Sequence, residues 1–287
     1  MLPGALKAKI KSGHVYWGAT LPVNSLISGG ESILVRADGR RWDESRPASI
    51  TLNHQKFAEG SALIEVGETK VLCAVSLEER VPAFLRGQGK GWVTAEYAML
   101  PRATNTRTAR DRDAGRINGR SQEIQRLIGR SLRAVTDLEA LGERTVTVDC
   151  DVIQADGGTR TAAITGAYVA LHQALQMLVD NRILPKLPIR DAVAAISVGI
   201  IDGELMLDLC YEEDFKADVD FNLVLTKSGD MVELQGATEA APFPRQQVVE
   251  VLDLAAAGME VLFKAQQEAL RNLCPARGRS FEINPMD

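Results

Sequence analysis

Five consecutive residues, Asp156-Gly157-Gly158-Thr159-Arg160, combine a flexible turn with groups that bind anions. They stand between a segment that alternates like a strand and one that repeats like a helix. Two glycines allow a tight turn, and the first turn of a helix offers free N–H groups and the positive end of its dipole. Thr159 adds a hydroxyl, and Arg160 adds a planar cation suited to phosphate. No Lys-Ser/Thr pair follows the glycines and the spacing is not that of a dinucleotide fingerprint, so a Walker loop and a Rossmann motif are both excluded.

A second junction of glycine and arginine, Asn118-Gly119-Arg120, precedes another expected helix. Two such junctions, one in each half of the chain, favour the convergence of Arg120 and Arg160 on a single anion. Two alternatives stay open. A glycine pair at a strand-to-helix turn is by itself more often structural, and Arg120 also fits the end of a basic surface loop.

Carboxylates recur every six residues at Asp208, Asp214 and Asp220, and Asp220 opens an apolar strand. An even spacing puts strand side chains on one face, although a loop lies between these three residues. Paired carboxylates at strand ends can hold Mg²⁺ and leave one group to move a proton. A solvated acidic loop is the competing interpretation, and the arginines elsewhere in the chain favour a functional one.

The charge of the chain is small overall and uneven along it. The net charge of −5 comes from 33 Lys and Arg against 38 Asp and Glu, which argues against an obvious nucleic-acid binder. Nevertheless, nine arginines and only three acids lie between Arg102 and Arg133. No aromatic residue separates Arg102, Arg107 and Arg110, so these cations suit backbone phosphates rather than base stacking. A contact between subunits is the alternative use.

The composition, 45% hydrophobic and 25% charged, is that of a globular protein and excludes collagen-like, low-complexity and mostly disordered chains. No apolar run is long enough to predict a transmembrane helix. The four cysteines are about 60 residues or more apart with no CxxC pair, so a zinc site and a disulfide framework are unsupported. Buried, reduced thiols in a cytoplasmic protein are the simplest interpretation.

The elements that must position these residues follow from periodicity. Three hairpins are expected, with turns at Gly67-Glu68, Asp202-Gly203 and Ser228-Gly229. Further strands are expected at 92–100 and 145–153, and helices over 124–135, 160–178 and 244–270, with Pro185 and Pro188 ending the second helix. Residues 102–119 are expected to form a long surface loop. The order of elements predicts an α+β fold in which two similar halves face one another.

Several strings of residues together closely resemble the bacterial ribonuclease PH family. They span residues 57–73, 87–102, 119–128, 154–161 and 233–239, and the similarity extends from about Asp38 to Leu270. The resemblance implies a ribosomal-S5-domain-2-like fold made of two βαβ-type halves. It further implies a phosphate-dependent 3′→5′ exoribonuclease that trims tRNA precursors and other RNA 3′ ends and releases nucleoside 5′-diphosphates, with a reverse reaction that adds nucleotides.

Site residues transfer from the same resemblance. Arg120 and the triplet Gly158, Thr159 and Arg160 match the phosphate site of the family. Asp214 and Asp220 match its metal-binding and acid/base carboxylates. The resemblance does not say which of the two donates the proton, and we expect Asp220 to do so. Arg102, Arg107 and Arg110 match the loop that grips tRNA.

The resemblance also implies partners and cofactors. They are Mg²⁺ or Mn²⁺, inorganic phosphate as co-substrate, and a cytoplasmic homohexamer built as a trimer of dimers that binds neither membranes nor DNA.

The predicted organisation is a loose leader over 1–34, a core over 35–272 with halves at 35–142 and 143–272, and a polar tail over 273–287. Three other functions share part of this pattern. A non-catalytic, RNA-binding ring subunit of the exosome-core type shares the fold but usually lacks part of the Arg and Asp set. A hydrolytic metal-dependent nuclease would need only the carboxylates. A polynucleotide phosphorylase needs a longer chain.

Overall fold

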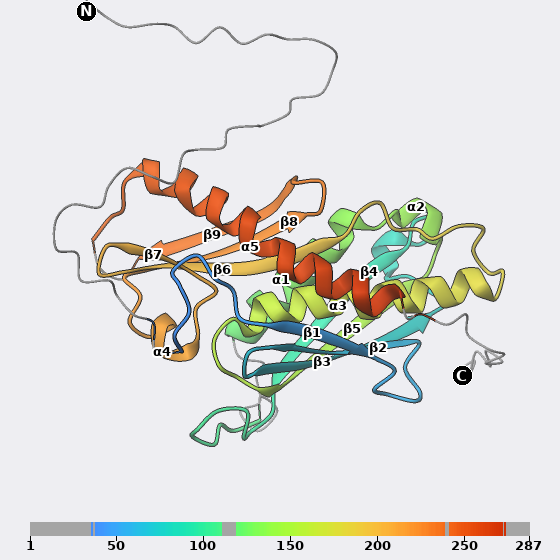
Figure 1. Cartoon of the computed structure of the whole chain (residues 1–287). Helices are drawn as coiled ribbons and strands as arrows, with labels where there is room; N and C mark the ends of the chain where they lie inside the picture. Colours follow the sequence, from blue (N-terminus) through green and yellow to red (C-terminus); the bar gives the residue numbers. More distant parts are fainter. Residues whose placement is uncertain (1–35, 37, 111–118, 239–240, 272, 274–287) are drawn as a thin grey trace, which may run out of the picture. The chain divides into compact units, whose positions relative to one another are not determined.

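A computed structural model describes residues 36, 38–110, 119–238, 241–271 and 273 (Figure 1). Its elements in chain order are β1 (Ala48–Leu52), β2 (Gly60–Val66), β3 (Thr69–Glu78), a 3₁₀ turn (Ala83–Leu85), β4 (Trp92–Met99), α1 (Gly119–Val135), α2 (Leu138–Leu141), β5 (Thr145–Gln154), α3 (Thr159–Asp180), β6 (Val193–Ile201), β7 (Glu204–Leu207), α4 (Tyr211–Asp214), β8 (Val219–Thr226), β9 (Met231–Thr238) and α5 (Arg245–Arg271). The predicted leader, residues 111–118 of the basic loop, and the tail after 273 lie outside the described residues.

The first sheet has five strands in the order β1-β2-β3-β5-β4. The predicted hairpin of β2 and β3 is confirmed, with Val66 paired to Thr69 across the turn. The strands pair antiparallel except β4 and β5, which are parallel. A parallel pair needs a crossover, and α1 lies in it and packs on β4. The apolar stripe predicted for this helix is buried, from Ile124 to Val135.

The second sheet has four strands in the order β7-β6-β8-β9, all antiparallel. The two predicted hairpins are confirmed. In the tight turn between β6 and β7, Asp202 and Gly203 both have positive φ, 52° and 84°, as the preferred hairpin turns require. Strand β6 is buried along its whole length because α3 and α5 pack against it.

Helix α3 is the centre of the fold, since it packs against β2, β3 and β5 of the first sheet and β6 and β8 of the second (Figure 1). Gly166 permits the close approach to the first sheet, because a Cβ there would lie 2.6 Å from Cγ2 of Ile64. By length and composition this helix of 22 residues is apolar enough to cross a membrane, but 78% of its apolar window is buried within the protein. It is the core helix on which both sheets pack.

Two details differ from expectation. Helix α3 ends at Asp180, before Pro185, because Asn181 caps it by donating its N–H to the Met177 carbonyl and Arg182 adopts a left-handed φ of 60°. The boundary between halves expected at 142 and 143 falls just before β5, which pairs with β3 and β4 in the first sheet. The mixed α+β class is confirmed.

Arg46 and Asp208 form a buried ion pair that joins the start of the chain's core to the segment after β7. The guanidinium donates to both carboxylate oxygens, at 3.0 and 2.7 Å, and the two side chains are 4% and 5% exposed. The backbone N–H of Arg46 donates to the same carboxylate at 2.8 Å. Asp208 therefore belongs to a structural pair.

Arg46→Met should lower the free energy of unfolding by about 3–5 kcal/mol, because it leaves Asp208 buried and unpaired. Arg41→Met is the control. Arg41 pairs with Asp43 through a side chain that is 73% exposed, and this loss should cost about 0–1 kcal/mol. Urea unfolding of both variants measures the difference, and equal losses would contradict a structural role for the buried pair.

Candidate active site

The turn before α3 requires both of its glycines. Gly157 and Gly158 have positive φ of 70° and 62°, a conformation that favours glycine. A Cβ at Gly157 would lie 2.5 Å from the Leu209 carbonyl oxygen and 2.9 Å from the Tyr211 nitrogen, so the turn packs directly on the backbone that leads into α4. The predicted strand–glycine turn–helix arrangement is confirmed, with Thr159 as the first residue of α3.

Three neighbours hold this turn in place. Thr69 donates its hydroxyl to the Gly157 carbonyl at 2.7 Å and accepts from the Asp156 N–H at 2.9 Å. Arg46 donates to the Asp156 carbonyl at 2.5 Å, and the Tyr211 N–H donates to the Asp156 carboxylate at 3.2 Å. The first turn of α3 is therefore fixed before any ligand arrives.

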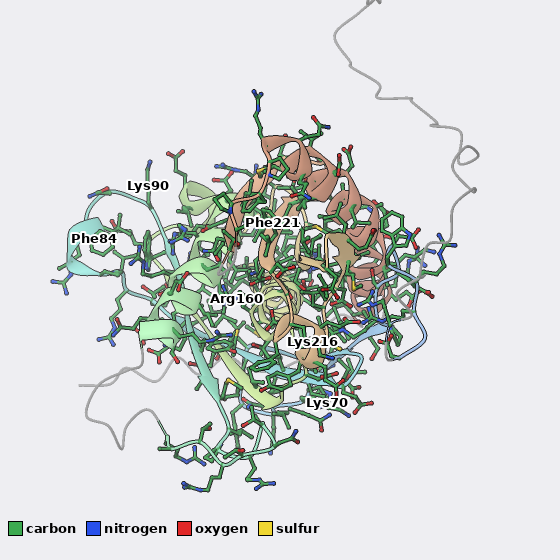
Figure 2. The ribbon with its side chains drawn as sticks, turned by 90° about the vertical axis from the view of Figure 1, so that its left-hand side faces the viewer. Lys70, Phe84, Lys90, Arg160, Lys216 and Phe221 are labelled. Atoms are coloured by element: carbon green, nitrogen blue, oxygen red, sulfur yellow. The ribbon has the colours of Figure 1, made fainter. Side chains whose placement is uncertain are left out.

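Tyr97 of β4 lies beneath the start of α3, with its hydroxyl 2.8 Å from that of Thr159. Burial raises the pKa of Tyr97, whereas the hydrogen bond to Thr159 and the positive charges of Arg120 and Arg160 lower it. The two arginines therefore lie close enough to act on one phenol, although they begin different helices. Figure 2 looks onto this end of the molecule, with Arg160 near the middle of the view.

Asp220 of β8 faces the same region. Burial raises the pKa of Asp220 and the negative charge of Asp214 raises it further, whereas Arg160, a hydrogen bond from Asn222 and Arg120 lower it. Asn222 donates to the Asp220 carboxylate at 3.0 Å. Strand β8, helix α4 and the first turns of α1 and α3 thus bring two carboxylates and two guanidinium groups together.

The carboxylate pair fits a divalent cation. Asp220 is half-buried and Asp214 lies close to it, so their two negative charges together are costly, and a hard cation with oxygen ligands relieves that cost. Within the part of the chain that the structure describes, no group of three or more His, Cys, Asp or Glu side chains is placed to hold a metal. Asp214 and Asp220 would therefore share the ion with ligands from the substrate or from water. Asp208, third of the evenly spaced acids, is engaged by Arg46 instead.

The basic loop begins beside the glycine turn, because the Ala155 N–H donates to the Ala103 carbonyl at 2.9 Å. Arg102, Arg107 and Arg110 are exposed and belong to neither helix nor strand. Arg110 lies close enough to Asp151 to lower its pKa, which burial raises. The loop that carries these three arginines therefore starts next to the glycine turn of the site.

Sequence reasoning missed three polar residues of the site, Tyr97, Asn222 and Gln235, the last of which accepts from Arg160 at 3.3 Å. One signal was available. Tyr97 occupies a core-facing position of a strand, where a tyrosine hydroxyl needs a polar partner. Gln235 lies in the string 233–239 that resembles the family, but the resemblance gave it no role, and nothing local distinguished Asn222 from other strand residues.

Comparison with known proteins agrees with the resemblance seen in the sequence. The chain matches "3′ exoribonuclease family, domain 1" over residues 44–175 and "domain 2" over 191–258. It is 59% identical over 232 residues to ribonuclease PH of Dehalococcoides mccartyi, which covers 81% of this chain and 96% of that protein. It is 54% identical over 245 residues to ribonuclease PH of Moorella thermoacetica, covering 85% and 98%.

Solved structures share the fold. The chain superposes on rice Rrp46 with a TM-score of 0.67 at 22% identity, covering 82% of this chain and 100% of the rice protein. It superposes on the Archaeoglobus fulgidus exosome with RNA bound to the active site with a TM-score of 0.66 at 24% identity, covering 82% and 92%. These likenesses support the S5-domain-2-like fold that the resemblance implied.

Proposed function

Since the chain belongs to the ribonuclease PH family of 3′ exoribonucleases, we propose that Arg120, Arg160, Asp214 and Asp220 form its active site. The enzyme is a phosphate-dependent 3′→5′ exoribonuclease and tRNA nucleotidyltransferase. One observation carries the assignment of the site. The charges of Asp214, Arg160 and Arg120 all act on the half-buried carboxyl of Asp220, although the four residues come from four different elements.

The cations bind the nucleophile. In phosphorolysis an anion attacks an anionic ester, so positive charge must offset the repulsion and align the attack. Arg120 and Arg160 each offer a planar donor fork from the first turn of a helix, where free N–H groups add to the field. The Thr159 hydroxyl, positioned by Tyr97, adds a third donor. These groups hold inorganic phosphate against the terminal phosphodiester of the RNA.

The carboxylates serve the leaving group. As an oxygen of phosphate forms a bond to the terminal phosphorus, the bond from that phosphorus to the 3′ oxygen of the preceding nucleotide breaks. We assign to Asp220 the donation of the proton that this oxygen needs, because it lies among these charges and its pKa is raised, by burial first and then by Asp214. A divalent cation held by Asp214 and Asp220, which we propose to be Mg²⁺, would supply positive charge beside the scissile phosphate.

Arg102, Arg107 and Arg110 grip the body of the RNA, which we propose to be a tRNA precursor. The basic loop begins beside the glycine turn, so an RNA whose backbone binds to this loop can place its 3′ end in the site. We further propose that residues 35–272 act as a catalytic core within a cytoplasmic homohexamer. The family membership supports the assembly.

Replacing all three of these arginines with alanine should weaken RNA binding and reduce the dependence of log K on log salt by about 2, because three phosphate contacts are lost. Fluorescence anisotropy with a labelled tRNA precursor across a salt series measures both effects. Lys264→Ala, an exposed cation on α5, is the control and should change neither. An unchanged salt slope in the triple variant would mean that the loop does not contact the backbone.

Reversibility tests the proposed function. With phosphate and Mg²⁺, a 3′-extended RNA should shorten. With nucleoside diphosphates and no phosphate, the same RNA should lengthen, because phosphorolysis conserves the energy of the bond and hydrolysis does not. Shortening that needs no phosphate, or failure to lengthen the RNA, would contradict phosphorolysis. RNA that binds but never changes length would point to a non-catalytic subunit.

A further inference from the structure

The segment 233–239 resembles the family but has no role in the mechanism above, and its first and third residues form a chain of hydrogen bonds that ends on Arg160. Gln235 accepts from Arg160 Nη1 with its amide oxygen at 3.3 Å. Its amide nitrogen donates to Glu233 at 3.2 Å. Glu233 in turn accepts from Nε of Arg130 at 3.0 Å and from Nη2 at 2.7 and 2.9 Å. Being two apart on β9, Glu233 and Gln235 share a face of the strand.

The carboxylate of Glu233 fixes the orientation of the Gln235 side-chain amide. An ionised Glu233 can only accept, so the NH₂ group of Gln235 must turn toward it and the amide oxygen must turn toward Arg160. Arg130 grips Glu233 in a bidentate pair and so fixes the carboxylate itself. The Glu233 side chain is 17% exposed, which limits its freedom to turn away.

The hydrogen bonds from Arg160 through Gln235 and Glu233 to Arg130 leave the positive charge of Arg160 available for phosphate. The amide oxygen of Gln235 is neutral, so it orients the guanidinium of Arg160 without cancelling the positive charge that phosphate needs. The nearest carboxylate beyond it, Glu233, is compensated by Arg130. Arg130 belongs to α1, the helix that also carries Arg120, so the contacts tie together the two helices that begin with the proposed phosphate ligands.

We propose that Gln235, held by Glu233 and Arg130, is a positioning residue that presents Arg160 to the attacking phosphate. This inference rests on the proposed function of Arg160. According to this inference, Glu233 and Gln235 of β9 contribute to the affinity for phosphate and not to the chemical step. The pair should therefore affect KM for phosphate and leave kcat and KM for RNA nearly unchanged.

The test compares two variants of one residue. Gln235→Leu, similar in size and unable to hydrogen-bond, should raise KM for phosphate about 10-fold, the cost of a hydrogen bond to a charged group. Gln235→Glu should raise it further, because a carboxylate there pairs with Arg160 and repels phosphate. The dissociation constant of inorganic phosphate, measured by titration calorimetry on the full chain, should follow the same order. Thermal unfolding controls for misfolding, and Gln235→Glu keeps the size of the side chain.

Combining Gln235→Leu with Arg160→Ala distinguishes a failure of this inference from a failure of the proposed phosphate site. If Gln235 acts through Arg160, Gln235→Leu should not weaken phosphate binding further in the Arg160→Ala background. Equal effects in both backgrounds, or no effect in the wild-type background while Arg160→Ala weakens binding, would overturn the inference alone. If Arg160→Ala itself leaves phosphate binding unchanged, the proposed phosphate site is wrong and the inference falls with it.

Discussion

Asp220→Asn should lower kcat by about 10³-fold, the usual contribution of a positioned general acid, and leave RNA affinity unchanged. Asparagine keeps the size of the side chain and can still accept from Asn222, but it cannot give up a proton to the leaving 3′ oxygen. No loss of stability is expected, because burial and Asp214 already disfavour the charged carboxylate. Single-turnover rates at saturating phosphate and RNA isolate the chemical step from binding.

Asp218→Asn is the matched control. Asp218 is exposed and lies two residues before Asp220. Its replacement changes the local charge but removes no proposed site residue, so activity should stay within about 2-fold of wild type. A kcat for Asp220→Asn that equals that of the control would remove Asp220 from the reaction. The proton would then come from another group.

Arg120→Ala should raise KM for phosphate by about 30-fold or more, because a charge-assisted contact to the nucleophile is lost. Arg120 lies in the first turn of α1, and its charge acts on both Tyr97 and Asp220. The RNA should bind as before, since its grip is assigned to the basic loop. Initial rates over a phosphate series give the constant.

Arg126→Ala serves as the comparison. Arg126 is an exposed arginine of the same helix, six residues further along, and its loss removes the same charge from α1 at a distance from the site. Its KM for phosphate should match that of wild type. A similar rise in both variants would mean that only the general field of the basic helix matters, and that Arg120 makes no direct contact.

Local signals predicted most of the fold. Alternation with a turn glycine located the hairpin of β2 and β3, and the dipeptide Asp202-Gly203 located that of β6 and β7. The 3.6-residue stripe from Ile124 to Val135 located α1. These features depend on neighbours in sequence. The parallel pairing of β4 with β5, by contrast, depends on a crossover of more than forty residues, and no local pattern specifies it.

The same limit applies to the site. The glycine turn pointed to Thr159 and Arg160, because a tight turn before a helix offers free N–H groups that bind anions. Asp208 looked equivalent to Asp214 and Asp220 by spacing, but its partner Arg46 is 162 residues away in sequence. Gln235 meets Arg160 across 75 residues, so only the folded chain reveals that contact. Spacing identifies candidate carboxylates and does not say which of them are already paired.

The fate of labelled phosphate tests the central claim most directly. A 3′-extended tRNA precursor is incubated with the full chain, Mg²⁺ and radiolabelled inorganic phosphate, and the released nucleotides are separated. If phosphate held by Arg120 and Arg160 is the nucleophile, the label appears in nucleoside 5′-diphosphates as the β-phosphate, and release stops when phosphate is withdrawn. Unlabelled nucleoside monophosphates, released at the same rate without phosphate, would show that water is the nucleophile and would contradict a phosphorolytic site.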